Sequence, residues 1–334
     1  MKKIHPIYFF LLFNLTLTAQ DTLITTKEGC KVLIATKAYY PGLSISWSGP
    51  CFQNYAHGQG LRKVYKNDTL LATYDGKLAF GSREGYATTT GTEGSIYKGE
   101  YKNNMRDGKG KYTDATGMSY TGSYKLDKAE GYGEYVFSNG DTYKGNYSNG
   151  EYEGLGTFTY VDGEVQVGEY KNGNINGKSK IVLPDKRILE GEFLNNRLHG
   201  KGSMTWPDGN KYVGEFIQGA FHGKGKLTFT KGGWYEGEFL NGNYSGKGKL
   251  NNGKGDTYEG EMLNGKLHGK GKYTYKNGDI YAGEFRYGVQ NGYGEFTTKE
   301  GTLKGLTIDG KRTGEFTKVD KNGKQTKVDY STVE

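Results

Sequence analysis

A glycine recurs along this chain at an interval of 23 residues, and this recurrence restricts the chain to a repeat architecture. Each of these glycines is followed by another glycine nine residues later. Because each copy is too short to enclose a core, neighbouring copies must stabilise one another. The regular copies begin at Gly99, Gly122, Gly145, Gly168, Gly191, Gly214, Gly237, Gly260 and Gly283, and looser copies begin at Gly49, Gly76 and Gly305.

Each copy carries the signals of a β-hairpin. In the copy at Gly260, an aromatic residue, Tyr258, precedes the glycine, and the pair Asn264-Gly265 follows it. Asn-Gly between strand-like segments is the strongest short signal for a two-residue hairpin turn. Such a turn pairs the first glycine with the glycine nine residues on, and Tyr258 with Gly271. An aromatic ring over a cross-strand glycine compensates for the missing side chain.

The loop between copies must differ from this turn. Side chains alternate between the two faces of a strand, and the repeat length is odd. Two even turns would therefore invert the aromatic face in every copy, so one loop needs an odd length or a bulge. Ser138–Gly140 fits a three-residue loop that ends in a left-handed glycine, as do residues 207–209. This register pairs aromatic residues of neighbouring copies: Tyr112 with Tyr120, Tyr135 with Tyr143, and Tyr273 with Tyr281, with Met204 opposite Tyr212.

The predicted fold is all-β. We expect an elongated single-layer antiparallel meander of about twelve stacked hairpins, curved or twisted into a rod, with aromatic rows and glycines on one face and Lys, Glu and Thr on the other. The residues that define the repeat are Tyr97, Gly99, Gly108, Gly110, Tyr120, Gly122, Tyr143, Gly145, Tyr212, Gly214, Gly223, Gly225, Tyr235, Gly237, Tyr258, Gly260, Gly269, Gly271, Tyr281 and Gly283.

The two ends of the chain differ from the repeats. Lys2 and Lys3, the apolar run Ile7–Leu17 and small residues after it predict a secretory signal peptide over residues 1–20, the alternative being a buried N-terminal segment. Strand-like residues 21–46 predict a β cap that covers the open edge of the array. The array itself spans residues 47–316, and residues 317–334 are expected to be a polar, frayed tail.

The chain has two cysteines, Cys30 and Cys51. An exported protein can keep a disulfide, and an even count permits one between the cap and the first repeat. The alternative is a pair of free buried thiols.

Composition argues against several function classes. The formal charge of +8 is spread along the chain without the basic runs that grip nucleic acid. The apolar run is too short to span a bilayer as a permanent helix, so we expect no transmembrane span after cleavage of the signal peptide. No nucleotide-binding loop is complete and no catalytic set stands out, so we expect no enzyme activity and no cofactor.

Histidine and glutamate each recur at one position of the repeat, where they are candidate metal ligands. His57, His199, His222 and His268 share one repeat position, but copies two strands apart lie about 10 Å from each other, too far for a shared metal ion. Glutamates after the first glycine, such as Glu215, are expected to pair with lysines such as Lys224 or Lys247. No metal site is therefore predicted.

The pattern Tyr-x-Gly-Glu-aromatic followed by Gly-x-Gly resembles the MORN repeat, and the resemblance covers residues 47–316. Gln166 and Leu189 depart from it in place of Tyr, and Ala87 and Ser179 in place of the second Gly. The cap, with residues 29–32 followed by 47–49, resembles exported MORN proteins of the Bacteroidetes type.

The resemblance implies an interaction module. MORN repeats serve as scaffolds, dimerisation surfaces or modules near membranes, and the catalytic domains that accompany some of them have no counterpart here. We therefore expect a non-catalytic, exported scaffold that binds an unidentified protein in the cell envelope, at the periplasm, outer-membrane surface or outside. The alternative is a peripheral module that binds a lipid headgroup or glycan through its aromatic and lysine face.

Overall fold

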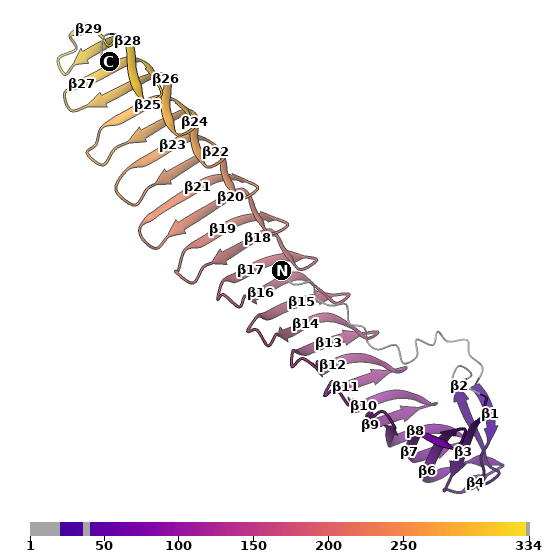
Figure 1. Ribbon diagram of the computed structural model, residues 1–334. Helices are drawn as coiled ribbons and strands as arrows, with labels where there is room; N and C mark the ends of the chain where they lie inside the picture. The colour runs from indigo at the N-terminus through magenta and orange to yellow at the C-terminus, as the bar shows by residue number, and fades with distance from the viewer. Residues whose placement is uncertain (1–20, 36–40, 332–334) are drawn as a thin grey trace. The chain divides into compact units, whose positions relative to one another are not determined.

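The computed structural model describes residues 21–35 and 41–331, and within them it contains 29 β-strands and no helix. This confirms the predicted all-β class. The predicted signal peptide, residues 1–20, lies outside the described residues. The chain forms two compact units, one up to Asn176 and one from Gly177. Figure 1 shows the strands from β6 onward following one another in sequence order within each unit.

Unit 1 contains a small cap sheet and an antiparallel meander. The cap sheet has the order β1-β2-β5-β4, and the meander runs from β3 to β6 and then in sequence order to β15. The strands are β1 (Asp21–Thr25), β2 (Lys31–Ala35), β3 (Leu43–Trp47), β4 (Cys51–Phe52), β5 (Tyr55–Ala56), β6 (Gly58–Lys66), β7 (Thr69–Ala79), β8 (Ser82–Gly91), β9 (Ile96–Lys102), β10 (Met105–Thr113), β11 (Ser119–Lys125), β12 (Lys128–Val136), β13 (Thr142–Ser148), β14 (Glu151–Thr159) and β15 (Val165–Lys171).

Unit 2 is a second antiparallel meander in sequence order, and β16 (Asn174–Val182) carries the boundary between the units. Its other strands are β17 (Ile188–Leu194), β18 (Arg197–Thr205), β19 (Lys211–Ile217), β20 (Ala220–Phe229), β21 (Gly233–Leu240), β22 (Asn243–Asn251), β23 (Thr257–Leu263), β24 (Lys266–Thr274), β25 (Ile280–Arg286), β26 (Val289–Thr298), β27 (Gly301–Ile308), β28 (Lys311–Asp320) and β29 (Gln325–Asp329).

The loops between copies follow the predicted register. Tyr135 pairs with Tyr143 around the loop Ser138–Gly140, and the same holds for Tyr112 with Tyr120, Met204 with Tyr212, and Tyr273 with Tyr281. In the loop, the Gly140 N–H donates to the Phe137 carbonyl at 2.9 Å, and Gly140 has a φ of 91°. A three-residue loop with a left-handed glycine therefore keeps every aromatic row on one face.

Within each hairpin, the predicted strand register is correct next to the turn and wrong farther along the two strands. The Asn264-Gly265 turn forms as expected, with φ of 49° and 79°, and the pairs nearest the turn are in the predicted register. The register then shifts, so that Gly260 pairs with Gly271 rather than Gly269, and Tyr258 with Tyr273 rather than Gly271. The cause is a β-bulge, because Gly269 and the next residue have no partner in β23.

The core of each unit is a layer of tyrosine rings that lie over the glycine row. Tyr143, Tyr212, Tyr235 and Tyr258 are at most 1% exposed. The rings of Tyr143, Tyr212 and Tyr258 each meet the aromatic residue two strands on in an edge-to-face contact, such as Tyr258 with Phe285 at a centroid distance of 5.2 Å. Tyr235 has Met262 at the equivalent position instead. Consecutive copies are therefore joined by ring contacts as well as by the hydrogen bonds of the sheet.

The cap and the array exchange strands across the predicted boundary at residue 46. Strand β3, expected in the cap, pairs with β6 of the meander, whereas β4 and β5, expected in the array, belong to the cap sheet. The reason is the ring of Trp47, which lies over Gly49 and Gly60 as a repeat tyrosine does over its own glycines. The chain leaves the meander after Trp47 and returns to it at β6.

The described part of the predicted frayed tail (317–334), which ends at residue 331, belongs to a hairpin instead. Strand β28 extends to Asp320, and β29 pairs with it. The ring of Tyr330 packs on the buried Phe316 at a centroid distance of 5.1 Å. The loop Lys321–Gly323 has the same three-residue form as the loops between copies, with Gly323 at φ 83°, and this signal was present in the sequence.

A disulfide joins Cys30 and Cys51, whose Cα atoms are 5.7 Å apart. It ties β4 to the end of the β1–β2 hairpin, beside the backbone bond from the Lys31 N–H to the Asn54 carbonyl at 2.7 Å. The cap sheet is therefore held by one covalent link and a few strand pairs.

Replacing Cys30 and Cys51 with serine is expected to lower the stability of the cap by about 3 kcal/mol, because the closed loop restricts the unfolded chain. Hydrogen exchange of β1 and β2 should accelerate, while exchange in β19–β24 stays unchanged. Unaltered exchange in the cap would contradict this role of the disulfide.

Candidate functional site

The repeat-defining residues meet in one arrangement on the inner face of each hairpin, defined as the face that carries the buried tyrosine rings. The ring of Tyr258 lies over Gly260 and Gly271, and a Cβ on either glycine would overlap the ring. Tyr212 covers Gly225 in the same way, so the predicted ring-over-glycine contacts are present although the direct pairing differs. The same contact recurs at Tyr97, Tyr120, Tyr143, Tyr235 and Tyr281 with their glycines Gly99, Gly110, Gly122, Gly145, Gly237 and Gly283.

The tyrosine hydroxyl has a function that sequence reasoning missed. The Tyr258 hydroxyl donates to the Glu261 carbonyl at 2.8 Å and reaches the His268 carbonyl at 3.3 Å. These two residues form the last ladder pair before the bulge, so the hydroxyl satisfies carbonyls beside the interruption. The first of these bonds recurs from Tyr74, Tyr97, Tyr120, Tyr143, Tyr212, Tyr235 and Tyr281.

Replacing Tyr258 with phenylalanine should destabilise unit 2 by about 1–2 kcal/mol, because the part-buried Glu261 carbonyl loses this donor while the ring remains. Chemical denaturation monitored by circular dichroism measures this change. Tyr293→Phe, at a tyrosine that is 71% exposed, serves as the control and should stay within about 0.5 kcal/mol of the parent. Equal effects of the two substitutions would contradict a role for the hydroxyl.

The glutamates after the first glycine also belong to the bulge. Glu261 Oε1 accepts the backbone N–H of Lys270 at 3.2 Å, and a Cβ on Gly269 would overlap the Glu261 carboxylate. Gly269 itself has a φ of 56°, and Gly108 and Gly223 occupy the same position with φ of 113° and 55°. Glycine is required there for its backbone conformation as well as for space.

The expected pairing of these glutamates with lysine needs a correction. Glu215 does contact Lys224, but through the lysine backbone N–H at 3.4 Å and not through the ammonium group. The ion pairs of the outer, opposite face join other positions, for example Lys249 with Glu259 at 3.1 Å. Such exposed pairs contribute little, about 0–1 kcal/mol each.

The repeated histidine position links neighbouring copies. His57 Nδ1 accepts the backbone N–H of Phe80 at 3.4 Å, and in unit 1 Glu130 Oε2 makes the corresponding bond to the Asn149 N–H at 3.0 Å. In the described parts of the chain, no group of three or more His, Cys, Asp or Glu could hold a metal ion.

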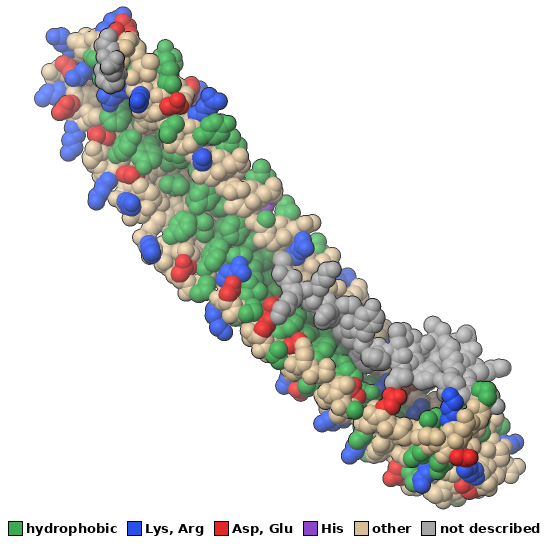
Figure 2. Space-filling view, viewed as in Figure 1, with side chains coloured by type: hydrophobic (Ala, Val, Ile, Leu, Met, Phe, Trp, Pro, Cys, Tyr) green, Lys and Arg blue, Asp and Glu red, His purple; other side chains and the backbone are tan. Residues whose placement is uncertain are grey.

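A second aromatic layer covers the tyrosine rings of unit 2. Phe221 stacks on Tyr212 at a centroid distance of 3.8 Å, and Tyr244 stacks on Tyr235 at 3.9 Å. Unlike the rings beneath them, these residues are half-buried. Figure 2 shows hydrophobic side chains gathered in a band along this face of unit 2. We call the half-buried residues Phe221, Leu227, Tyr244, Leu250, Leu267 and Tyr273 the inner band.

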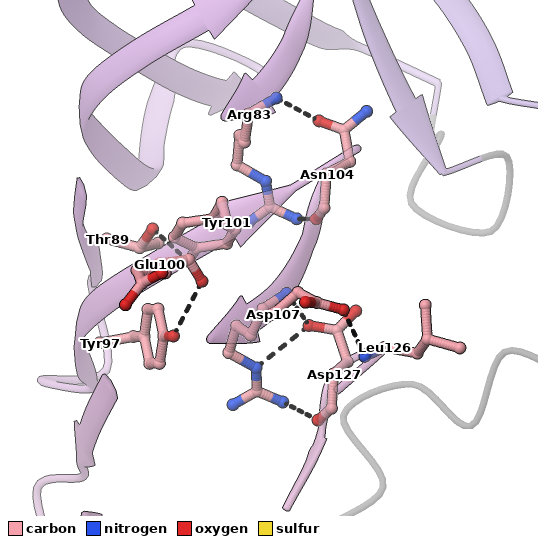
Figure 3. A network of polar contacts seen from close by, with 10 residues as sticks. Arg83, Thr89, Tyr97, Glu100, Tyr101, Asn104, Asp107, Leu126 and Asp127 are labelled. Atoms are coloured by element: carbon pink, nitrogen blue, oxygen red, sulfur yellow. Dashed lines mark hydrogen bonds and ion pairs between the residues drawn. The ribbon is translucent and has the colours of Figure 1, made fainter. Parts of the chain in front are cut away.

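The inner face of unit 1 is more polar. Arg106 lies near the rings of Tyr97 and Tyr124, with its Cζ 5.6 and 4.8 Å from the ring centroids, and its Nε contacts Asp127 Oδ1 at 3.1 Å. Tyrosines replace the phenylalanines of unit 2, as at Tyr101, Tyr124 and Tyr147. Figure 3 shows this polar network, with the hydroxyl of Tyr101 against Thr89 and the backbone N–H of Leu126 against Asp107.

The sequence profile of the MORN repeat matches this chain in eight segments that together cover more than half of it: residues 97–119, 120–142, 143–165, 190–211, 212–234, 235–257, 258–280 and 281–303. The chain belongs to the MORN-repeat family. The profile leaves out residues 166–189, the MORN copy in which Gln166 and Ser179 replace residues of the pattern. MORN repeats are commonly protein- or membrane-interaction repeats.

Wider comparisons add little to the MORN assignment. No curated protein matches the chain. The TCP domain of SAS-4 from Drosophila melanogaster, in complex with a proline-rich motif of Ana2, is 14% identical, with 49% of this chain and 94% of that chain covered and a TM-score of 0.30. The TCP10 domain of Danio rerio CPAP is 11% identical, with 81% of this chain and 95% of that chain covered and a TM-score of 0.16. Virginiamycin B lyase from Staphylococcus aureus is 13% identical, with 75% of this chain and 71% of that chain covered and a TM-score of 0.13.

Among the described residues, there is no helix long and apolar enough to cross a membrane.

Proposed function

We propose that this MORN protein is an exported, non-catalytic scaffold that binds another protein of the cell envelope through the inner band. The observation that carries the proposal is the half-exposed second layer of aromatic and aliphatic side chains in unit 2. Apolar surface that stays partly exposed over a rigid sheet is typical of interaction sites.

The geometry of the inner band favours a particular kind of partner. Successive copies are two strands apart, so equivalent side chains such as Phe221, Tyr244 and Leu267 recur at about 10 Å. The rings rest on buried tyrosines and lose little freedom on binding. An extended segment of a partner, with apolar side chains at a matching interval, would place each of them between two copies.

Two observations support a non-catalytic role. The recurring polar groups of the repeat are engaged with the backbone, as Tyr258 is with the Glu261 carbonyl and Glu261 with the Lys270 N–H. They maintain the bulge that shapes the hairpin. The tyrosines of the layer are also held neutral, because burial raises the pKa of Tyr258 to about 12.

Export is supported by the signal-like first twenty residues and by the Cys30–Cys51 disulfide, since disulfides persist in oxidising compartments. N-terminal sequencing of the protein recovered from the native cell tests this proposal. We expect the mature chain to begin at Gln20 or Asp21. Recovery of the intact N-terminus from the cytosol, with both thiols free, would refute it.

The scaffold role is tested by crosslinking in intact cells, followed by identification of the captured protein. We expect one stoichiometric partner, and the variant with Tyr244→Gln and Leu267→Gln should lose it while keeping the circular-dichroism spectrum of the parent. Lys249→Gln, on the outer face, is the matched control and should retain the partner. Retention by the Tyr244/Leu267 variant, or no stoichiometric partner at all, would exclude binding through the inner band.

A specific feature of unit 1 favours a second candidate function, binding to an anionic lipid or glycan surface. Lys102, Lys125 and Lys171 are exposed at the same repeat position, where unit 2 has Leu194, Ile217, Leu240 and Leu263. Such a lysine row attracts anionic headgroups in a salt-dependent way. Sedimentation with anionic liposomes at low salt should then show binding that the three Lys→Gln changes abolish, and no binding at low salt removes this candidate.

A further inference from the structure

Two arginines on the inner face of unit 1, Arg62 and Arg83, have guanidinium groups without enough acceptors. Arg62 is 9% exposed, and its Nε and Nη1 are buried without a hydrogen-bond partner. Arg83 Nε is buried and unpartnered as well, whereas its Nη2 donates to the Asn104 carbonyl. An unpaired buried charge is costly, so this arrangement requires an explanation.

The two guanidinium groups belong to one cluster. Arg62 Cζ lies 5.6 Å from the centroid of the Tyr74 ring, and Arg83 Cζ lies 4.5 Å from that of Tyr101. The two rings meet edge to face at a centroid distance of 5.5 Å. Burial, followed by the positive charge of Arg83, lowers the pKa of Arg62 to about 10. Arg62 therefore remains charged at neutral pH, and the positive charge of Arg83 repels it.

The next copy provides an internal comparison. Arg106 occupies the position of Arg83, and Asp127 occupies the position of Asn104. Asp127 Oδ1 accepts the Arg106 backbone N–H at 2.8 Å, just as Asn104 Oδ1 accepts that of Arg83 at 2.8 Å. Asp127 Oδ1 also accepts the Arg106 Nε at 3.1 Å, whereas the Arg83 Nε has no such acceptor. Figure 3 shows Asn104 next to Arg83, and Asp127 in the equivalent place of the next copy.

The protein itself therefore neutralises Arg106 but leaves Arg62 and Arg83 without a counter-charge. Among the ion pairs of the described residues, none includes Arg62 or Arg83. The carboxylate of Glu84, next to Arg83 in the chain, accepts the Asn103 N–H at 3.1 Å instead.

We infer that Arg62 and Arg83 bind a doubly charged oxyanion, namely a phosphate group that is either free or at the end of a larger molecule. Two guanidinium groups supply a charge of +2 and donors directed by planar geometry, which suits phosphate oxygens. Arg83 is half-buried, so the cluster can be reached from the inner face, and desolvation of the site strengthens the attraction. The site is separate from the inner band of unit 2 and does not depend on the proposed scaffold role.

The key variant is Asn104→Asp, which gives Arg83 the carboxylate that Arg106 already has. Isothermal titration of the full mature chain with inorganic phosphate, at constant ionic strength, should show one saturable site. Asn104→Asp should weaken phosphate binding at least tenfold and raise the melting temperature in phosphate-free buffer. Asn139→Asp, in an exposed loop of the same unit, adds the same charge elsewhere and should leave phosphate affinity unchanged. It should not raise the melting temperature, because it places a carboxylate against that of Asp141.

Further titrations distinguish the source of the phosphate and guard against misfolding. Glycerol phosphate binding as tightly as inorganic phosphate indicates a terminal phosphate group, and binding of inorganic phosphate alone indicates the free ion. Arg83→Met should abolish binding, and if this variant does not fold, Asn104→Asp still decides. No saturable phosphate binding by the parent chain, or equal affinity in the Asn104→Asp variant, overturns the inference.

Discussion

Replacing Gly271 with alanine is expected to unfold the β23–β24 hairpin locally and to cost about 3 kcal/mol or more, at the upper end of overpacking effects. A Cβ at this position would overlap the hydroxyl, Cε2 and Cζ of Tyr258. The ring cannot move away easily, because its hydroxyl is bonded to the Glu261 carbonyl and it contacts Phe285 edge to face. Denaturation monitored by circular dichroism, together with hydrogen exchange of β22–β25, measures the loss.

Gly265→Ala is the control for this substitution. Gly265 lies in the turn of the same hairpin at φ 79°, and a Cβ there would meet no atom within 4 Å. Its cost is limited to the backbone conformation, about 1–2 kcal/mol. Gly271 has no left-handed φ, so its intolerance is steric. If Gly271→Ala is no less stable than Gly265→Ala, the ring does not lie where the structure places it.

Alkaline pH is expected to unfold the repeat array in a steep transition. Burial, followed by the nearby glutamate charge, raises the pKa of Tyr212, Tyr235 and Tyr258 to about 12. Burial also raises the pKa of Tyr120 and Tyr143 well above the ordinary value. An unfolded chain releases these phenol protons near pH 10, so it binds fewer protons than the folded chain above that pH. Stability is therefore fully present below about pH 10 and is lost as the pH rises from about 10 to about 12.

Two signals followed during one pH titration test this expectation. Tyrosinate absorbance from the buried rings should appear together with loss of the β-sheet circular-dichroism signal, because the rings ionise only when the array opens. The same chain in concentrated urea, whose tyrosines should ionise near pH 10, is the reference. Full tyrosinate absorbance near pH 10 with the sheet intact would show that the tyrosine layer is open to solvent.

Several structural features could be predicted from the sequence because they are local. The Asn264-Gly265 pair determines its own turn, and the three residues Ser138–Gly140 determine theirs, since each depends on backbone preferences over a few residues. The hairpin at β28–β29 carried the same local signal in Lys321–Gly323 and could have been predicted from it.

Other features required the tertiary structure because they depend on groups distant in the chain. The residues of the hairpin turn do not determine the bulge at Gly269. The bulge is stabilised by hydrogen bonds from Tyr258 and to Glu261 on the opposite strand. The inner band can be recognised only from the structure, because it depends on Phe221 stacking on the solvent side of the Tyr212 ring. Nothing in the spacing of the repeat distinguishes a buried ring from a half-exposed one.

The amino-acid sequence alone determined that this chain is a series of β-hairpins with tyrosine rings over glycines, because a period of 23 residues and the turn residues permit few other structures. Only the tertiary structure decided which strand pairs shift by a bulge, how the cap exchanges strands with the array, and where charge remains uncompensated. Arg62 and Arg83 become neighbours only when β6 and β8 lie on either side of β7, and a charge balance between side chains depends on that proximity in space.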